Sequence, residues 1–156
     1  MTAMPLAVEP AAPAAAAAAP LIAKVLADFA HDLTHEAIPE TVRERAKHLI
    51  LDATGIAFAS GRYDFAHKSL TAIAGLGGSG DVPVIGFPAR LSPRDAALVN
   101  GILVHGLDFD DTHTGAVLHV TTSIWPAVLS AGWMRGASGK DLLTAYVAGA
   151  EAITRL

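Results

Sequence analysis

The chain has 156 residues, of which 52% are hydrophobic and only 17% are charged. An intrinsically disordered chain would be poor in apolar residues and rich in charge, so this composition indicates a folded domain with a sizeable core. Eleven basic against fifteen acidic residues give a net charge of −4, which lacks the basic surface that nucleic-acid binding needs. The sequence contains no cysteine, which excludes disulfides, a thiolate nucleophile and cysteine-ligated zinc.

Alanine and proline dominate residues 1–20. The apolar run from Pro10 to Ala23 is interrupted by Pro13 and Pro20, and it is shorter than the ~20 residues that a membrane-spanning helix needs. No basic residue precedes Lys24, so the positively charged start of a signal peptide is missing. We expect residues 1–20 to be a disordered tail outside the core, and we expect a cytoplasmic protein that does not interact with membranes.

From residue 21 onward, apolar residues recur at helical spacing. Helix-start signals occur at Pro39, at Ser92-Pro93-Arg94-Asp95 and at Ser138-Gly139-Lys140-Asp141. These patterns predict an all-α fold over residues 21–156, with at most a short strand near residues 82–87. The apolar period still runs at the last residues, so we expect a truncated domain. The expected helices cover about residues 20–33, 39–60, 64–75, 92–103, 123–135 and 138 to the end of the sequence.

One window differs from the rest of the chain in its chemistry. Residues 105–119 contain three aspartates and three histidines, and there is no Lys or Arg between Arg94 and Arg135. Crowded carboxylates raise one another's pKa unless a cation compensates, and such groups often mark functional sites. The compensating cation must be a metal ion, a protonated histidine or a basic residue from another segment.

Helix geometry suggests which of these side chains share a face. If the helix from Ser92 continues, His105, Asp108 and Thr112 lie at positions i, i+3 and i+7 on one face. A break at Gly115 would then leave His119 free to fold back toward Asp108 and Thr112. In a competing interpretation, Asp110 and Asp111 cap neighbouring helices and His105 is a core residue. The continued helix would point three neighbouring side chains away from that face: Asp110, Asp111 and His113.

The residues of the window also match a known pattern: Asn100-Gly101, His105, Leu107-Asp-Phe-Asp-Asp-Thr-His113, Gly115 and His119. In this combination they resemble the MmgE/PrpD family, which includes 2-methylcitrate dehydratase, cis-aconitate decarboxylase and iminodisuccinate epimerase. The similarity extends over about residues 21–156. Family members continue through the rest of a helical domain and a separate α+β lid, in which further catalytic histidine and lysine residues lie.

The resemblance implies roles for particular residues. The active-site aspartate of the family matches Asp108, its threonine matches Thr112 and its first histidine matches His119, while His105 and His113 are candidates for substrate binding. Many members follow that histidine with Pro-Ser, whereas this chain has Val120-Thr121, which we expect to alter the local turn or the substrate contacts.

The reaction implied is proton abstraction next to a carboxylate of a small di- or tricarboxylate. Loss of water, loss of carbon dioxide or reprotonation then follows. In this scheme His119 is the acid or base, Asp108 orients it or the substrate, and Thr112 donates a hydrogen bond to the substrate. No cofactor or metal is implied. We expect a homodimer or a companion chain, and an isolated fragment that is inactive.

Two other classes of function remain open. His105, Asp108, Asp110, Asp111 and His113 include ligand types that suit Mg²⁺, Mn²⁺ or Zn²⁺. Isoprenoid synthases are also all-helical with an Asp-rich run, but their second Asp-rich motif and basic diphosphate-binding residues are missing here. Alternatively, the chain is a non-catalytic helical module that associates with itself or with a companion chain.

Overall fold

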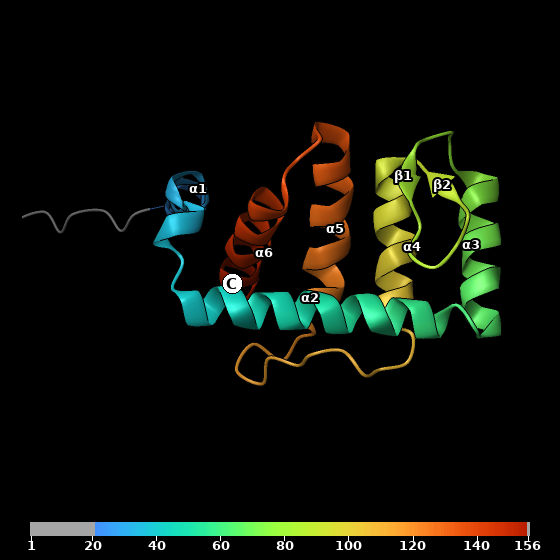
Figure 1. The fold of residues 1–156 in the computed structure, drawn as a ribbon, viewed down its shortest axis with the longest axis horizontal. Coiled ribbons are helices and arrows are strands. Elements are labelled where there is room, and N and C mark those ends of the chain that lie inside the picture. The colour runs from blue at the N-terminus through green and yellow to red at the C-terminus, as the bar shows by residue number, and fades with distance from the viewer. Residues whose placement is uncertain (1–20, 156) are drawn as a thin grey trace, which may run out of the picture.

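The computed structural model describes residues 21–155, and the tail expected over residues 1–20 lies outside them. The described chain is all-helical with one very small antiparallel strand pair, as the sequence predicts (Figure 1). No helix in this part of the chain combines the length and the apolar character that crossing a membrane requires. In chain order the elements are α1 (Ile22–Asp32), the 3₁₀ turn η1 (His35–Ala37), α2 (Glu40–Ser60), α3 (Asp64–Leu76), β1 (Val82–Pro83), β2 (Arg90–Leu91), α4 (Pro93–His105), α5 (Val120–Arg135) and α6 (Gly139–Ile153).

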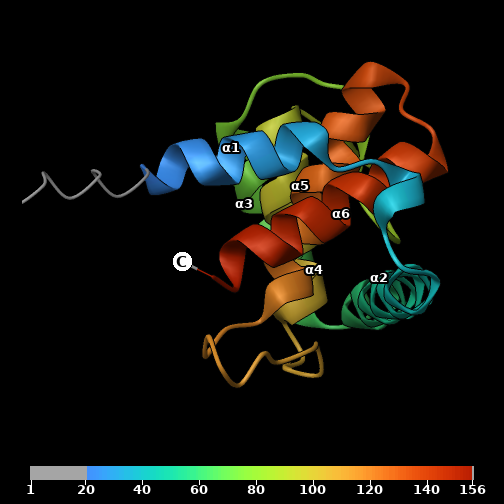
Figure 2. The same cartoon turned by 90° about the vertical axis from the view of Figure 1, so that its left-hand side faces the viewer.

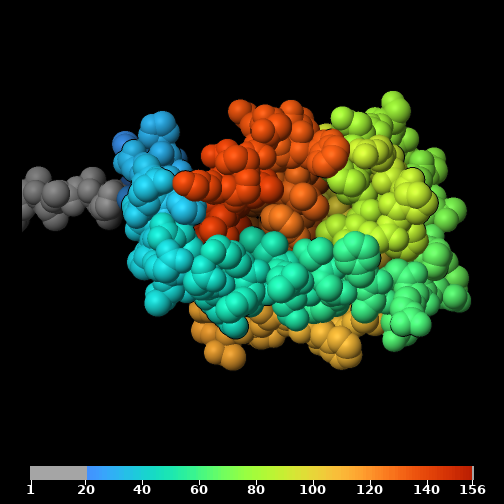
Figure 3. Space-filling view, in the orientation of Figure 1, coloured from blue at the N-terminus to red at the C-terminus, as the bar shows by residue number. Residues whose placement is uncertain are grey.

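Helix α2 runs along one side of the molecule, and α3, α4, α5 and α6 lie crosswise to it (Figure 1). The view along α2 shows α1 lying over α6, with the connection from α4 to α5 projecting on the opposite side of the molecule (Figure 2). In the space-filling view, α2 lies in front of the lower ends of the crossing helices (Figure 3). Residues 105–119 thus connect the end of α4 to the start of α5, and both of these helices pack on α2.

Small residues allow α2 to approach the crossing helices closely. Ala46, Ala53 and Ala57 are all buried on one face of α2. On the same helix, the Thr54 hydroxyl accepts a hydrogen bond of 3.1 Å from the indole N–H of Trp125 in α5. This contact satisfies the polar atom of a large buried ring, so α5 is held to α2 by both packing and a specific hydrogen bond.

The helix starts predicted at Ser92 and Ser138 are confirmed by their capping contacts. The Ser92 hydroxyl accepts from the backbone N–H of Asp95, and Ser138 and Asp141 form a reciprocal capping box at the start of α6. The Arg94 guanidinium, followed by the Ser92 hydroxyl, holds the pKa of Asp95 below its usual value. Local sequence therefore fixes where α4 and α6 begin.

The helix predicted over residues 20–33 forms as α1, but none of its residues is buried. Its apolar side chains lie on the surface, with Ile22 68% and Phe29 36% exposed. The helix contacts α6 rather than the central core. Helical spacing therefore predicts the element correctly, while its place at the edge of the bundle follows from the packing of the other helices.

Asn100 attaches the strand-bearing connection to α4. Its side chain is fully buried, its Oδ1 accepts from the backbone N–H of Ile85 at 2.8 Å, and its Nδ2 donates to the carbonyl of Pro83 at 3.1 Å. β1 pairs antiparallel with β2, so these two bonds hold the whole connection between α3 and α4. The asparagine of the sequence pattern thus has a structural role.

We predict that Asn100→Ala lowers the free energy of unfolding by about 2 to 3 kcal/mol, because it leaves the N–H of half-buried Ile85 and the carbonyl of half-buried Pro83 without their partner. The matched control is Leu98→Ala on the same helix, where the side chain is 53% exposed and the expected loss is within about 0.5 kcal/mol. Urea denaturation followed by circular dichroism measures both. Equal losses for the two variants would contradict this role of Asn100.

Candidate functional site

Helix α4 ends at His105, close to the end expected near residue 103. The continuation that would place His105, Asp108 and Thr112 on one helical face does not occur. Gly106 is the C-cap and donates its N–H to the carbonyl of Ile102 at 2.9 Å. A side chain at Gly106 would collide with the ring of Phe65, so only glycine fits where the chain leaves the helix. The connection to α5 then makes a sharp turn rather than another helical turn.

Asp108 stands at the turn of this connection. Its backbone has φ +57°, in the left-handed region that aspartate tolerates better than most residues, and its N–H donates to the carbonyl of His105 at 2.8 Å. This turn reverses the direction of the chain below the end of α4. The expected alignment of His105, Asp108 and Thr112 along one helical face is therefore replaced by a loop geometry.

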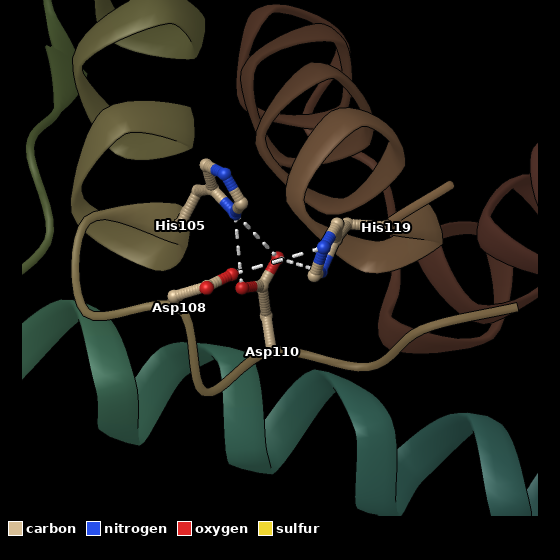
Figure 4. A group of neighbouring side chains, drawn as sticks. All are labelled: His105, Asp108, Asp110 and His119. Atoms are coloured by element: carbon tan, nitrogen blue, oxygen red, sulfur yellow. Dashed lines mark hydrogen bonds and ion pairs between the residues drawn. The ribbon is translucent and has the colours of Figure 1, made fainter. Parts of the chain in front are cut away.

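The loop gathers His105, Asp108, Asp110 and His119 into one cluster, with a ligand atom of each within 4.8 Å of those of the others (Figure 4). Nδ1 of His105 lies 3.1 Å from Oδ1 of Asp110. His119 comes from the start of α5, with Nδ1 3.4 Å from Oδ2 of Asp110 and Nε2 3.8 Å from Oδ1 of Asp108. His119 folds back toward Asp108, as the sequence predicts, but Thr112, which was expected beside them, is not one of the four residues of this cluster.

Asp110 occupies the centre of the cluster, which corrects the prediction that its side chain points away from the other candidates. That side chain is 1% exposed, whereas the side chain of Asp108 is 80% exposed. His119 is intermediate at 31%. The cluster therefore has a buried carboxylate on one side of the His119 ring and a solvent-accessible carboxylate on the other.

The carboxylates of this cluster lie beside imidazole nitrogens. Among the described residues, Asp108 and Asp110 form ion pairs with His105 and His119 and with no Lys or Arg. Of the three sources of cation that the sequence left open, histidine is the one whose side chains lie beside these two carboxylates. The rings of His105 and His119 also meet edge to face, with centroids 4.8 Å apart.

Asp111 fulfils the capping role that the competing interpretation gave it. Its Oδ1 accepts from the backbone N–H of Thr121 at 3.2 Å, in the first turn of α5. His113 also serves the loop, since its Nδ1 accepts from the backbone N–H of Ala116 at 3.0 Å. Asp111 and His113 belong to the same sequence window, but their hydrogen bonds stabilise the loop and the start of α5. Neither residue is part of the four-residue cluster.

Thr112 and His113 line a groove of about 720 Å³ between α2 and α6. Arg45 of α2 lines the same groove, so a basic residue from another segment does reach the window. The buried hydroxyl of Tyr146 lies at this groove and shares a hydrogen bond of 2.6 Å with the Thr121 hydroxyl. The groove therefore combines a cation with hydroxyl groups next to the cluster's loop.

Two chemistries fit the four-residue cluster. Two imidazole nitrogens and two carboxylate oxygens are a ligand set that suits Zn²⁺ or Mn²⁺, with His105, Asp108, Asp110 and His119 as ligands. Without a metal, the same groups can accept, hold and return a proton. Asp111 and His113, which the sequence included in the possible metal set, are engaged elsewhere in the loop.

Comparison with known proteins identifies the class to which this fold and site belong. Residues 24–156 match the model of the MmgE/PrpD N-terminal domain, so the chain belongs to the MmgE/PrpD family. Cis-aconitate decarboxylase of Mus musculus is 37% identical over 119 residues, covering 72% of this chain and 24% of the relative. Cis-aconitate decarboxylase of Aspergillus terreus is 32% identical over 120 residues, covering 74% and 24%. The chain spans about a quarter of the length of the curated relatives it matches.

The buried phenol of Tyr146 gives a testable pH dependence. Burial raises its pKa, the charge of Asp111 adds to that rise, and the Thr121 hydroxyl and Arg45 act against it. A raised pKa means that the stabilisation is complete below the ordinary tyrosine value of about 10 and is lost as pH rises through the folded-state value. We predict that the stability advantage of the wild type over Tyr146→Phe shrinks above about pH 10.

Urea unfolding from neutral to alkaline pH measures this difference. The control is Tyr63→Phe, because Tyr63 is 52% exposed. This variant should lose free energy of unfolding at alkaline pH in the same way as the wild type. Curves for the wild type and Tyr146→Phe that stay parallel across the alkaline range would show that Tyr146 is not the titrating group.

Proposed function

We propose that the chain carries part of the active site of a lyase that acts on a small di- or tricarboxylate by removing a proton next to a carboxylate. The observation that supports this most directly is the His119 imidazole held between the buried carboxylate of Asp110 and the exposed carboxylate of Asp108. Family membership supports dehydration or decarboxylation as the overall reaction. The names of the relatives favour decarboxylation of cis-aconitate or a similar acid.

In this proposal His119 is the acid–base residue and Asp108 orients it or the substrate. Nε2 of His119 takes the proton from the carbon, and the electron pair of that bond moves toward the neighbouring substrate carboxylate. In a dehydration, hydroxide then leaves the adjacent carbon and takes up a proton to depart as water, and in an epimerisation the proton returns to the carbon. In a decarboxylation, the bond to the departing carboxylate breaks in place of the C–H bond, and its electron pair takes a proton from protonated His119. The charge that develops on the carboxylate oxygen needs cationic donors close to it.

The remaining candidates bind the substrate. We assign to Thr112 a hydrogen bond to a substrate carboxylate or hydroxyl, and to His105 and His113 contacts with the substrate. Arg45 lines the groove beside Thr112 and His113, which supports a substrate that carries more than one carboxylate. We further propose that a second copy or a companion chain supplies additional cationic groups.

In a full-length family member that carries this window, we predict that His119→Ala lowers kcat by about 10² to 10⁴-fold, which is the usual contribution of a general acid or base. Asp108→Asn should also be severely damaging, because it keeps the shape of the side chain and removes its charge. His31→Ala, at an exposed position on α1, is the control. Near-normal rates for both site variants on the native substrate would refute the assignment.

The 156-residue chain alone should show no turnover of cis-aconitate or 2-methylcitrate. The substrate would approach Asp108 and Asp110, and within residues 21–155 neither carboxylate is paired with a Lys or Arg. Two like charges about 4 Å apart repel by roughly 4 kcal/mol at an effective dielectric constant near 20. Robust turnover by the purified chain would contradict this account. Restoration by the separately expressed remainder of a close relative would support it.

The metal hypothesis predicts a different response to added metal ions than the lyase hypothesis. Thermal denaturation distinguishes the two. A proton-transfer site leaves the melting temperature unchanged when Mg²⁺, Mn²⁺ or Zn²⁺ is added, whereas a metal centre is stabilised by mass action. The control is His119→Ala, which removes one ligand of the cluster. Stabilisation of the wild type that EDTA reverses and His119→Ala abolishes would favour the metal site over the lyase mechanism proposed above.

A further inference from the structure

A single buried carboxylate faces the same ring nitrogen of two histidines. Oδ1 and Oδ2 of Asp110 lie 3.1 and 3.2 Å from Nδ1 of His105. Oδ2 also lies 3.4 Å from Nδ1 of His119 (Figure 4). Because the Asp110 side chain is 1% exposed, water has little access to these oxygens, and the two imidazoles are the groups placed to satisfy them.

The protonation of the rings follows from this arrangement. A neutral imidazole carries one N–H, and if that hydrogen were on Nε2, the lone pair of Nδ1 would face the carboxylate. A buried carboxylate that met only lone pairs would be strongly unfavourable. Nδ1 of His119 is itself buried, and among the described residues it has no hydrogen bond of normal geometry. Oδ2 of Asp110 lies 3.4 Å from this nitrogen, at ion-pair distance.

We infer that Asp110 is a positioning residue that holds both His105 and His119 with the hydrogen on Nδ1. The bare Nε2 of His119 is then directed toward Asp108, as a base ready to receive a proton. The tautomers follow from the geometry alone, while their catalytic meaning rests on the proposed lyase function. This inference gives a role to an aspartate for which the family resemblance implied none.

The tautomer explains how His119 can serve as base and then as acid. With the hydrogen on Nδ1, Nε2 of His119 and Oδ1 of Asp108 are two acceptors 3.8 Å apart, an arrangement that favours a hydrogen donor between them. When Nε2 takes a proton, the resulting imidazolium has a carboxylate on each side, Asp108 and Asp110. Asp110 does not need to touch the substrate to have this effect.

Imidazole nitrogen NMR on the 156-residue chain tests the inference without any substrate. At about pH 8.5, well above the ordinary histidine pKa near 6.5, both His105 and His119 should show a protonated Nδ1 and an unprotonated Nε2. In Asp110→Asn the amide offers one acceptor and one donor, so at least one ring should switch its hydrogen to Nε2. The matched control, Asp111→Asn, should leave both tautomers unchanged, because an asparagine oxygen can still accept from Thr121.

A second variant keeps the test decisive if Asp110→Asn does not fold, as judged by its amide spectrum. His105→Phe leaves His119 as the one imidazole beside Asp110, and His119 should keep its hydrogen on Nδ1. An Nε2–H tautomer of His119 in the wild type or in His105→Phe would overturn the inference. Unchanged tautomers of both rings in a folded Asp110→Asn would also overturn it. Kinetic measurements that refuted the lyase function would not change these spectra. A failure of the proposed function can therefore be distinguished from a failure of the tautomer inference.

Discussion

The arrangement of the candidate site depends on one constraint, the burial of the Asp110 carboxylate between two imidazoles. An ionised group that is almost fully removed from water needs donors on its oxygens, and here those donors come from the last residue of α4 and from the residue just before α5. The carboxylate thus ties together two helix ends that are separated by the whole connecting loop. Nδ1 of His119 lies 3.4 Å from the same carboxylate, on which His105 also converges.

The helices that carry these two histidines are fixed independently of the site. Asn100 attaches α4 to the strand-bearing connection, and Trp125 of α5 donates a hydrogen bond to α2. Asp111 satisfies an N–H in the first turn of α5. A site built on anchored helix ends holds its geometry more precisely than one carried by a free loop, so the irregular connection between α4 and α5 can still position the side chains of the cluster.

Sequence alone predicted the elements that local chemistry determines. Helix periodicity and the caps at Ser92 and Ser138 gave the helices close to their observed bounds, because a cap depends on residues three positions apart. The pattern of the window also brought His119 and Asp108 together correctly. Gly106, which follows the apolar run Leu103-Val104 after one residue, is a local signal for this helix end, since a glycine just past the last helical residue is typical of a helix C-terminus.

The central place of Asp110 could not be derived in the same way. Its burial depends on a turn at Asp108 and on two rings from different helices, which are contacts that no local pattern records. Helical geometry assigned it to the wrong face because the helix itself stops at His105. The place of Arg45 in the groove could not be predicted from local patterns either, because Arg45 lies on α2, far from the window in sequence.

The central claim is that this site moves a proton at a carbon next to a carboxylate. The most direct measurement follows that hydrogen by NMR in deuterated water, with a full-length family member that carries this window and its native substrate. The account predicts that the hydrogen of the substrate is lost to solvent during turnover, at a rate that depends on the His119 imidazole. Turnover in which the substrate keeps that hydrogen throughout would contradict it.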